Sequence, residues 1–262
     1  MKKLLLGLAA LLIIVGVIFA VRLVGARDET DAVDTKDAAA IVNGDDSDDE
    51  DRPGTAGDRP EPGTYTYAGS GKESVTILGG STHVFPKEIP VVVELDEDNE
   101  QEWTANAVFV KQHIEERDYR TTNAGLEDLG FTRKIEFFGQ LQDNEYECSD
   151  GAERFRADAE PGSTTSWTCT QEGGKAELAY TSTLVGTETL EIGGEDVEVW
   201  HVKVASTQSG DTVGTDASEF WYAETGLAVR MKANLKTRTK SVLGETDFTE
   251  LYDYTLTSLV PE

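Results

Sequence analysis

The chain has few cysteines, few histidines and few basic residues, and each shortage narrows what it can be. Its two cysteines, Cys148 and Cys169, exclude a four-cysteine zinc site and a C-x-x-C redox pair. A single disulfide formed in an oxidising compartment is the natural interpretation, and two unrelated buried thiols are the alternative. Because no cysteine lies directly after the apolar N-terminal segment, the sequence also excludes lipid attachment to a mature N-terminal cysteine.

Familiar catalytic and metal-binding motifs are missing as well. The sequence contains no G-x-S-x-G, no H-E-x-x-H and no P-loop. Its histidines, His83, His113 and His201, lie in strand-like segments without metal-ligand spacing, so we expect half-buried or surface side chains, no metal site and no cofactor. Gly69-Ser70-Gly71 lacks a following helix and is predicted to form a turn. We therefore predict that the protein is not an enzyme.

Acidic residues outnumber basic residues by about two to one. The 23 Lys and Arg face 50 Asp and Glu, which gives a formal net charge of −27. Nucleic-acid binding depends on basic side chains that neutralise phosphates, and adsorption to anionic lipid headgroups has the same requirement. The composition therefore excludes both classes of partner and indicates a highly soluble surface.

The N-terminal segment, residues 1–26, is the one long apolar stretch. Leu4 to Val21 are eighteen residues without a charge, enough, with the residues to position 24, to cross a hydrocarbon core of about 30 Å. We predict an uncleaved signal anchor that contacts the membrane through residues 4–24, with the rest of the chain outside the cytoplasm. The alternative is a signal peptide cleaved near Ala26, which would release the protein.

Residues 27–63 differ in composition from the rest of the chain. They contain thirteen Asp or Glu, four Lys or Arg and no aromatic residue. Such a segment buries too little apolar surface to offset its ordering entropy. We predict a disordered acidic linker between the anchor and an extracytoplasmic domain over residues 64–262.

That domain shows the patterns of β-strands. Between Val229 and Lys236 apolar and polar residues alternate strictly, which is typical of a strand with one buried face. Gly193-Gly194 separates two extended runs and predicts a hairpin. No segment sustains a helical period over three turns. The fold class that we predict is mostly β: an antiparallel curved sheet, either a half-barrel or a sandwich.

The aromatic residues supply the only candidate ligand site. Four tryptophans could line an apolar cavity, although core packing is the favoured explanation for them. The candidate ligand-binding residues are Trp200, Trp221, Tyr252 and Tyr254.

One stretch supports a resemblance. In residues 220–230, Phe-Trp-Tyr is followed by a Gly-Leu turn and a returning strand with an arginine, and residues 252–256 continue the pattern. This passage is similar to LolA-like envelope domains of the lipoprotein-carrier type. The resemblance implies a curved antiparallel sheet that holds an acyl chain, and it transfers no individual functional residue.

These observations leave three hypotheses. The first is a membrane-anchored domain of the cell envelope that binds a hydrophobic or lipidic ligand, which requires a continuous apolar cavity. The second is a non-catalytic envelope module that contacts another protein or the cell wall, which predicts a filled core and an exposed apolar or aromatic patch. The third, lower in rank, is a hydrolase that uses two carboxylates. The sequence does not predict the oligomeric state.

Overall fold

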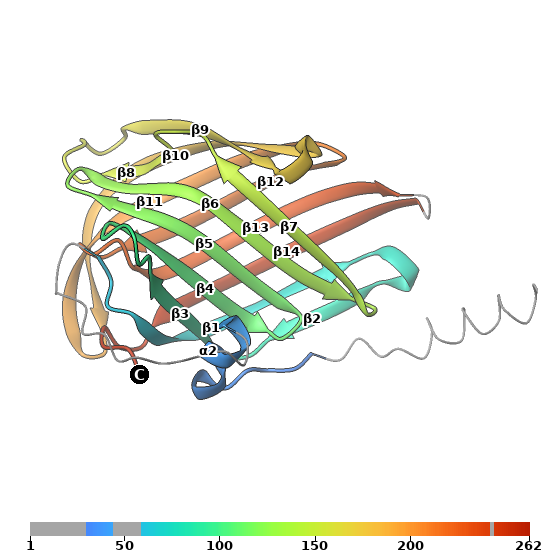
Figure 1. The fold of residues 1–262 in the computed structure, drawn as a ribbon, viewed down its shortest axis with the longest axis horizontal. Helices are drawn as coiled ribbons and strands as arrows, with labels where there is room; N and C mark the ends of the chain where they lie inside the picture. The colour runs from blue at the N-terminus through green and yellow to red at the C-terminus, as the bar shows by residue number, and fades with distance from the viewer. Residues whose placement is uncertain (1–29, 44–58, 242–243) are drawn as a thin grey trace, which may run out of the picture.

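Twelve antiparallel strands close into a barrel in the computed structural model of the chain (Figure 1). The structure describes residues 30–43, 59–241 and 244–262. Its elements are α2 (Thr35–Asn43), β1 (Gly63–Val75), η2 (Ile77–Gly79), β2 (Ser81–Phe85), β3 (Glu88–Leu95), β4 (Glu102–Val110), β5 (His113–Thr122), β6 (Gly125–Phe137), β7 (Gln140–Cys148), β8 (Glu153–Arg156), β9 (Thr164–Gln171), η3 (Glu172–Gly174), β10 (Ala176–Ile192), β11 (Glu195–Gly210), β12 (Thr212–Tyr222), β13 (Ala228–Ser241) and β14 (Gly244–Leu256).

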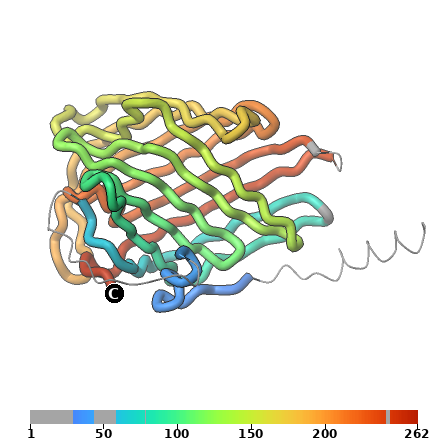
Figure 2. Tube along the Cα trace, viewed as in Figure 1, coloured from blue at the N-terminus to red at the C-terminus, as the bar shows by residue number. Residues whose placement is uncertain are grey.

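Strand order follows chain order around the barrel, and the first strand meets the last. The path runs from β14 down to β9, then through β7, β6, β5, β4 and β3 to β1, which pairs with β14 over Tyr67–Val75. The short strands β2 and β8 pair with β1 and β6. The C-terminal residues return to the start of β1, where the Glu262 amide donates to the Thr64 carbonyl (Figure 2). The prediction of a mostly β, antiparallel, curved sheet is confirmed, but the sheet is neither a half-barrel nor a sandwich.

Side chains alternate between the barrel interior and its outer surface. In β13, Val229, Met231, Ala233 and Leu235 are buried, as the strict alternation predicts. The hairpin predicted at Gly193-Gly194 is also confirmed, since Ile192 pairs with Glu195 across that turn.

The helix α2 lies within the segment 27–63 that we predicted to be disordered, so that prediction is wrong for residues 35–43. Its alanine-rich sequence favours a helix, and its apolar side packs on the outside of the barrel. Ala38 is fully buried there, together with Val92 of β3 and Val108 of β4. This cover explains why the run Val91–Val93 is buried on both faces of its strand.

The predicted signal anchor, with its membrane contact at residues 4–24, lies outside the described residues, as do residues 27–29 and 44–58 of the predicted linker. Within the described ranges, no helix has the length and apolar character needed to cross a membrane.

Gly69-Ser70-Gly71 is the middle of β1 rather than the predicted turn. The two glycines face the interior, where they pair with Tyr254 and Tyr252 of β14. A Cβ on Gly69 would lie 2.1 Å from the Asp253 carbonyl oxygen, and one on Gly71 would lie 2.6 Å from the Tyr252 Cβ. These glycines therefore allow the first and last strands to approach beneath two tyrosine rings.

We predict that Gly69→Ala lowers the free energy of unfolding by about 1–3 kcal/mol, because the added methyl overpacks the pairing that closes the barrel. Urea denaturation measures the effect. The control is Ser70→Ala, an exposed position on the same strand, which should change stability by less than about 0.5 kcal/mol. Equal midpoints for the two variants would contradict this role of Gly69.

Candidate functional site

Charged side chains occupy one part of the barrel interior, where a β-barrel core is usually apolar. We call this group the interior charge cluster. It consists of Glu73, His83, His113, Glu115, Arg117, Arg133, Asp216 and Glu250.

Glu73 of β1 lies between two histidines. His83 Nδ1 makes a 2.7 Å hydrogen bond with Glu73 Oε1. His113 Nδ1 lies 2.8 Å from Glu73 Oε2, but the angle of this second contact is not that of a well-aligned hydrogen bond. None of the three side chains is exposed to solvent. Burial alone would raise the pKa of Glu73, but the charges of the histidines and their hydrogen bonds outweigh it and hold that pKa at about 2. Glu73 is therefore an anion that orients both rings.

The opposite side of the His113 ring faces β5 and β6. His113 Nε2 lies 3.7 Å from Glu115 Oε1, and Glu115 accepts a 2.5 Å hydrogen bond from Arg133 Nε. Arg117 is 3.7 Å from the same carboxylate. Although burial raises the pKa of Glu115, these cations lower it well below its usual range.

Glu250 of β14 is the carboxylate of the cluster that accepts no hydrogen bond within the described part of the chain. Its side chain is 2% exposed, and neither carboxylate oxygen has a hydrogen-bond partner in the described residues. Burial raises the pKa of Glu250 to about 7, in spite of the opposing charges of His113 and Arg133. Glu250, His113 and Glu115 each offer one ligand atom within 4.8 Å of the others, which is a group that could hold a metal ion.

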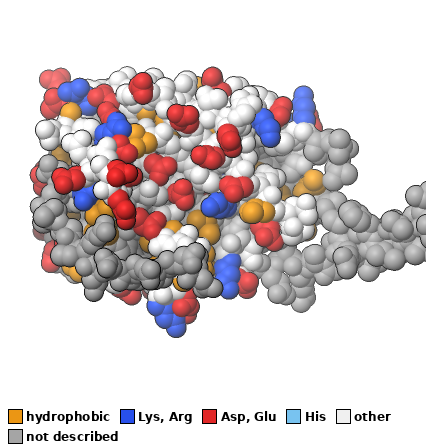
Figure 3. All heavy atoms as spheres, viewed as in Figure 1, with side chains coloured by type: hydrophobic (Ala, Val, Ile, Leu, Met, Phe, Trp, Pro, Cys, Tyr) orange, Lys and Arg blue, Asp and Glu red, His pale blue; other side chains and the backbone are white. Residues whose placement is uncertain are grey.

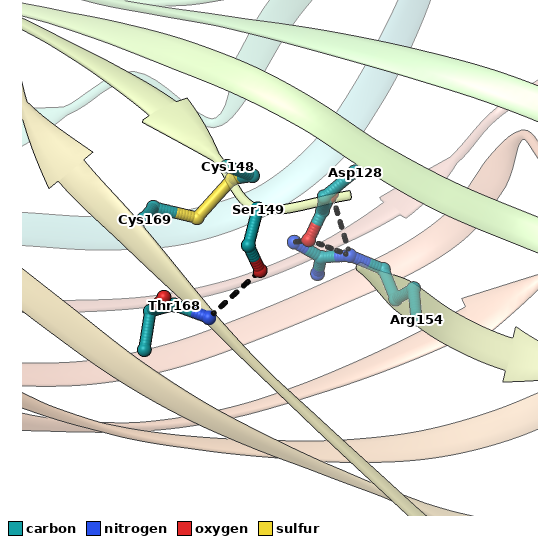
Figure 4. The surroundings of a disulfide bond; sticks show 6 residues. All are labelled: Asp128, Cys148, Ser149, Arg154, Thr168 and Cys169. Carbon is teal, nitrogen blue, oxygen red and sulfur yellow. Dashed lines mark hydrogen bonds and ion pairs between the residues drawn. A yellow bond between two sulfur atoms is a disulfide. The ribbon is translucent and has the colours of Figure 1, made fainter. Parts of the chain in front are cut away.

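A second buried ion pair lies elsewhere in the interior. Arg154 of β8 donates to both carboxylate oxygens of Asp128 at 2.7–3.0 Å (Figure 4). It also donates to the Tyr222 hydroxyl at 3.1 Å. Arg154 is 1% exposed and Asp128 is 5% exposed. These contacts tie the four-residue strand β8 to its neighbour β6 through Asp128 and, across the interior, to β12 through Tyr222.

A small cavity lies inside the barrel. Glu115, Arg117, Tyr119 and Tyr222 border it, together with the apolar side chains of β4 and β13. Its volume is about 50 Å³, room for only a few water molecules. Sites for organic ligands usually measure about 300–1,000 Å³, so side chains fill this barrel.

The structure does not bring the four predicted ligand-binding residues together. Tyr252 borders the cavity. Tyr254 is not one of the cavity's lining residues: it is fully buried next to Tyr252 and donates to the Pro86 carbonyl. Trp200 stacks on Phe155 at 5.6 Å and is not part of the cavity wall.

Trp221 faces the outer surface of the barrel. Its ring is covered by His201, 4.4 Å away, and by Arg230, 4.7 Å away, and its Nε1 donates to Glu188. Only 6% of Trp221 is exposed, so its contacts are those of a packed structural residue.

The disulfide Cys148–Cys169 is confirmed. Our expectation for His83 and His113 is wrong, because both are fully buried and share Glu73. Strands distant in sequence bring the cluster together, which spacing along the chain cannot show. One local signal was present: His113 and Glu115 are two positions apart on a strand, so they face the same side.

Solved structures similar to this chain include two lipoproteins. The hypothetical lipoprotein YmcC from Escherichia coli is 14% identical, with a TM-score of 0.32, over 76% of this chain and 89% of that protein. A candidate lipoprotein from Parabacteroides distasonis is 11% identical, with a TM-score of 0.28, over 76% of this chain and 96% of its own length. Scores this low support no conclusion about function. No family model matches the chain, and no curated protein matches it.

Proposed function

We propose that this chain is a non-catalytic, membrane-anchored module of the cell envelope, which uses the outer surface of its barrel to contact another macromolecule. The filled interior carries this proposal. A lipid carrier needs a continuous apolar cavity, and a space of about 50 Å³ does not accommodate an acyl chain. The apolar segment 4–24 and the disulfide support the extracytoplasmic placement.

The outer surface offers a specific place for such a contact. Five outward-facing carboxylates lie in two neighbouring rows across β3, β5 and β7, on the face seen in Figure 3. We call them the acidic band: Glu94, Glu116, Asp118, Glu145 and Glu147. Partial burial and repulsion from neighbouring carboxylates raise the pKa of Glu116. A basic partner would relieve this repulsion, so the surface favours a partner with positive charge.

Site-specific photocrosslinking in cells tests the proposal. A photoreactive residue at position 116, in the acidic band, should crosslink to a basic partner. The same residue at position 198, exposed on β11 in another part of the barrel, should not. Charge reversal by Asp118→Lys should weaken the crosslink. Equal crosslinking from both positions, or none from either, would contradict an interface at the acidic band.

Lipid binding is the competing function, and Tyr252 at the cavity wall is the observation that favours it. Native mass spectrometry of residues 30–262, exported and purified without detergent, distinguishes the two. We expect the mass of the chain without lipid. If a lipid co-purifies with the chain, and Tyr252→Ala removes it without unfolding the barrel, the protein is a lipid carrier and the proposal of an interaction module is wrong.

A further inference from the structure

Three groups in the interior charge cluster, His113, Glu115 and Glu250, face one another in a buried space. When a metal ion displaces the proton of His113 Nε2 and the Nδ1 hydrogen stays directed at Glu73, the Nε2 lone pair points toward Glu115 and Glu250. Glu250 lacks any hydrogen-bond donor in the described structure. Two carboxylates and a ring nitrogen that meet in a buried space need a positive charge among them.

The total charge of the cluster also favours a bound cation. Burial lowers the pKa of His113, but the charges of Glu73 and Glu250 and its contact with Glu115 outweigh burial and raise that pKa to about 10. Four ionised carboxylates therefore stand against two guanidinium groups and one imidazolium, which leaves a surplus of one negative charge when His83 is neutral. The carboxylates are Glu73, Glu115, Asp216 and Glu250, and the guanidinium groups are Arg117 and Arg133. A divalent cation that takes the place of the His113 proton would bring this sum to zero.

We propose that His113, Glu115 and Glu250 bind one divalent transition-metal ion inside the barrel, with Glu73 as the residue that positions His113. Imidazole nitrogen with carboxylate oxygen is a donor set suited to Zn²⁺, at bond lengths of about 2.0–2.2 Å. The three ligand atoms already lie within 4.8 Å of one another, so small side-chain movements would bring them to bonding distance. A carboxylate on the second ring nitrogen of a metal-bound histidine is a common supporting contact.

The ion would connect two walls of the barrel that share no hydrogen bonds. His113 and Glu115 come from β5, which pairs with β4 and β6, whereas Glu250 comes from β14, which pairs with β13 and β1. Its role would therefore be structural. This site lies inside the barrel and is independent of the contact proposed at the acidic band.

Zinc binding by the full-length chain tests the proposal. The chain is purified in detergent, stripped with a chelator, unfolded in urea and refolded with ZnCl₂, because fully buried ligands exchange slowly once the barrel has closed. Bound zinc is then measured by atomic emission after gel filtration, and the melting temperature is recorded with and without the metal. We expect one zinc ion per chain and a higher melting temperature with zinc.

Two variants show where the zinc binds. Glu250→Gln keeps the size of the side chain and removes its charge, so the metal-free protein should fold normally but bind zinc at least about 100-fold more weakly. The matched control is His201→Gln, because His201 also lies near two carboxylates, Glu188 and Glu219, but on the outer surface. This control should bind zinc as the unchanged chain does.

A third variant tests the positioning role of Glu73. Glu73→Gln should weaken zinc binding by about 10–100-fold without abolishing it. The proposal is overturned if the unchanged chain binds no zinc, if Glu250→Gln binds it with undiminished affinity, or if His201→Gln removes it. The first result would mean that protons neutralise the cluster.

Discussion

Replacement of Arg154 by methionine should lower the free energy of unfolding by about 3–5 kcal/mol, because it leaves the Asp128 carboxylate buried without its counter-ion. Arg154 is 1% exposed and makes hydrogen bonds to both Asp128 oxygens. It also holds the Tyr222 hydroxyl and stacks over Phe220 at 4.9 Å. Urea denaturation followed by tryptophan fluorescence and circular dichroism gives the stability of each variant.

A double variant separates charge from packing. Arg154→Met combined with Asp128→Leu removes both charges, and most of the lost stability should return, since apolar pairs often replace buried ion pairs without cost. Arg154→Lys should be destabilised as well, because an ammonium group cannot reproduce the two-pronged contact with Asp128. If the double variant is as unstable as Arg154→Met, the packing of the guanidinium on Phe220 is the main contribution.

The sequence predicted the C-terminal half of the barrel better than its N-terminal half, and the interior explains this. In β13 the inward positions from Val229 to Leu235 are all apolar, so alternation marks this part of the strand. In β5 the inward positions include His113, Glu115 and Arg117, which conceal the pattern. Consequently no break in the sequence pattern over residues 104–115 marks the two-residue turn between β4 and β5.

Closure and the interior charge cluster were beyond sequence reasoning for a different reason. The barrel closes because β1 pairs with β14, strands at opposite ends of the domain. The same pairing places Glu250 opposite Glu73, 177 positions earlier in the chain. No local pattern specifies such a contact, and a buried glutamate cannot be distinguished by composition among 50 acidic residues. Among the contacts between residues distant in the sequence, only the disulfide could be predicted directly, because two cysteines allow one pairing.

The disulfide closes the narrowest junction of the barrel. Strands β7 and β9 pair through only three residue pairs, Tyr146 with Gln171, Glu147 with Thr170 and Cys148 with Cys169, whereas β10 and β11 share sixteen. The Ser149 amide donates to the Thr168 carbonyl just beyond them (Figure 4 shows these residues beside the disulfide). With so few hydrogen bonds, this junction depends on the covalent link more than any long strand pair does.

We therefore expect Cys148→Ser combined with Cys169→Ser to lower the free energy of unfolding by about 3 kcal/mol, the chain-entropy value for a loop of this size. The loss should begin locally. Hydrogen exchange of β7 and β9 should accelerate before that of β12 and β13, because the remaining contacts at the junction are few. Ser149→Ala removes only a 3.4 Å contact with the Thr168 amide and should leave both measurements nearly unchanged. If exchange in the double variant accelerates equally in all strands, the disulfide stabilises the barrel globally and the β7–β9 junction is not its weak point.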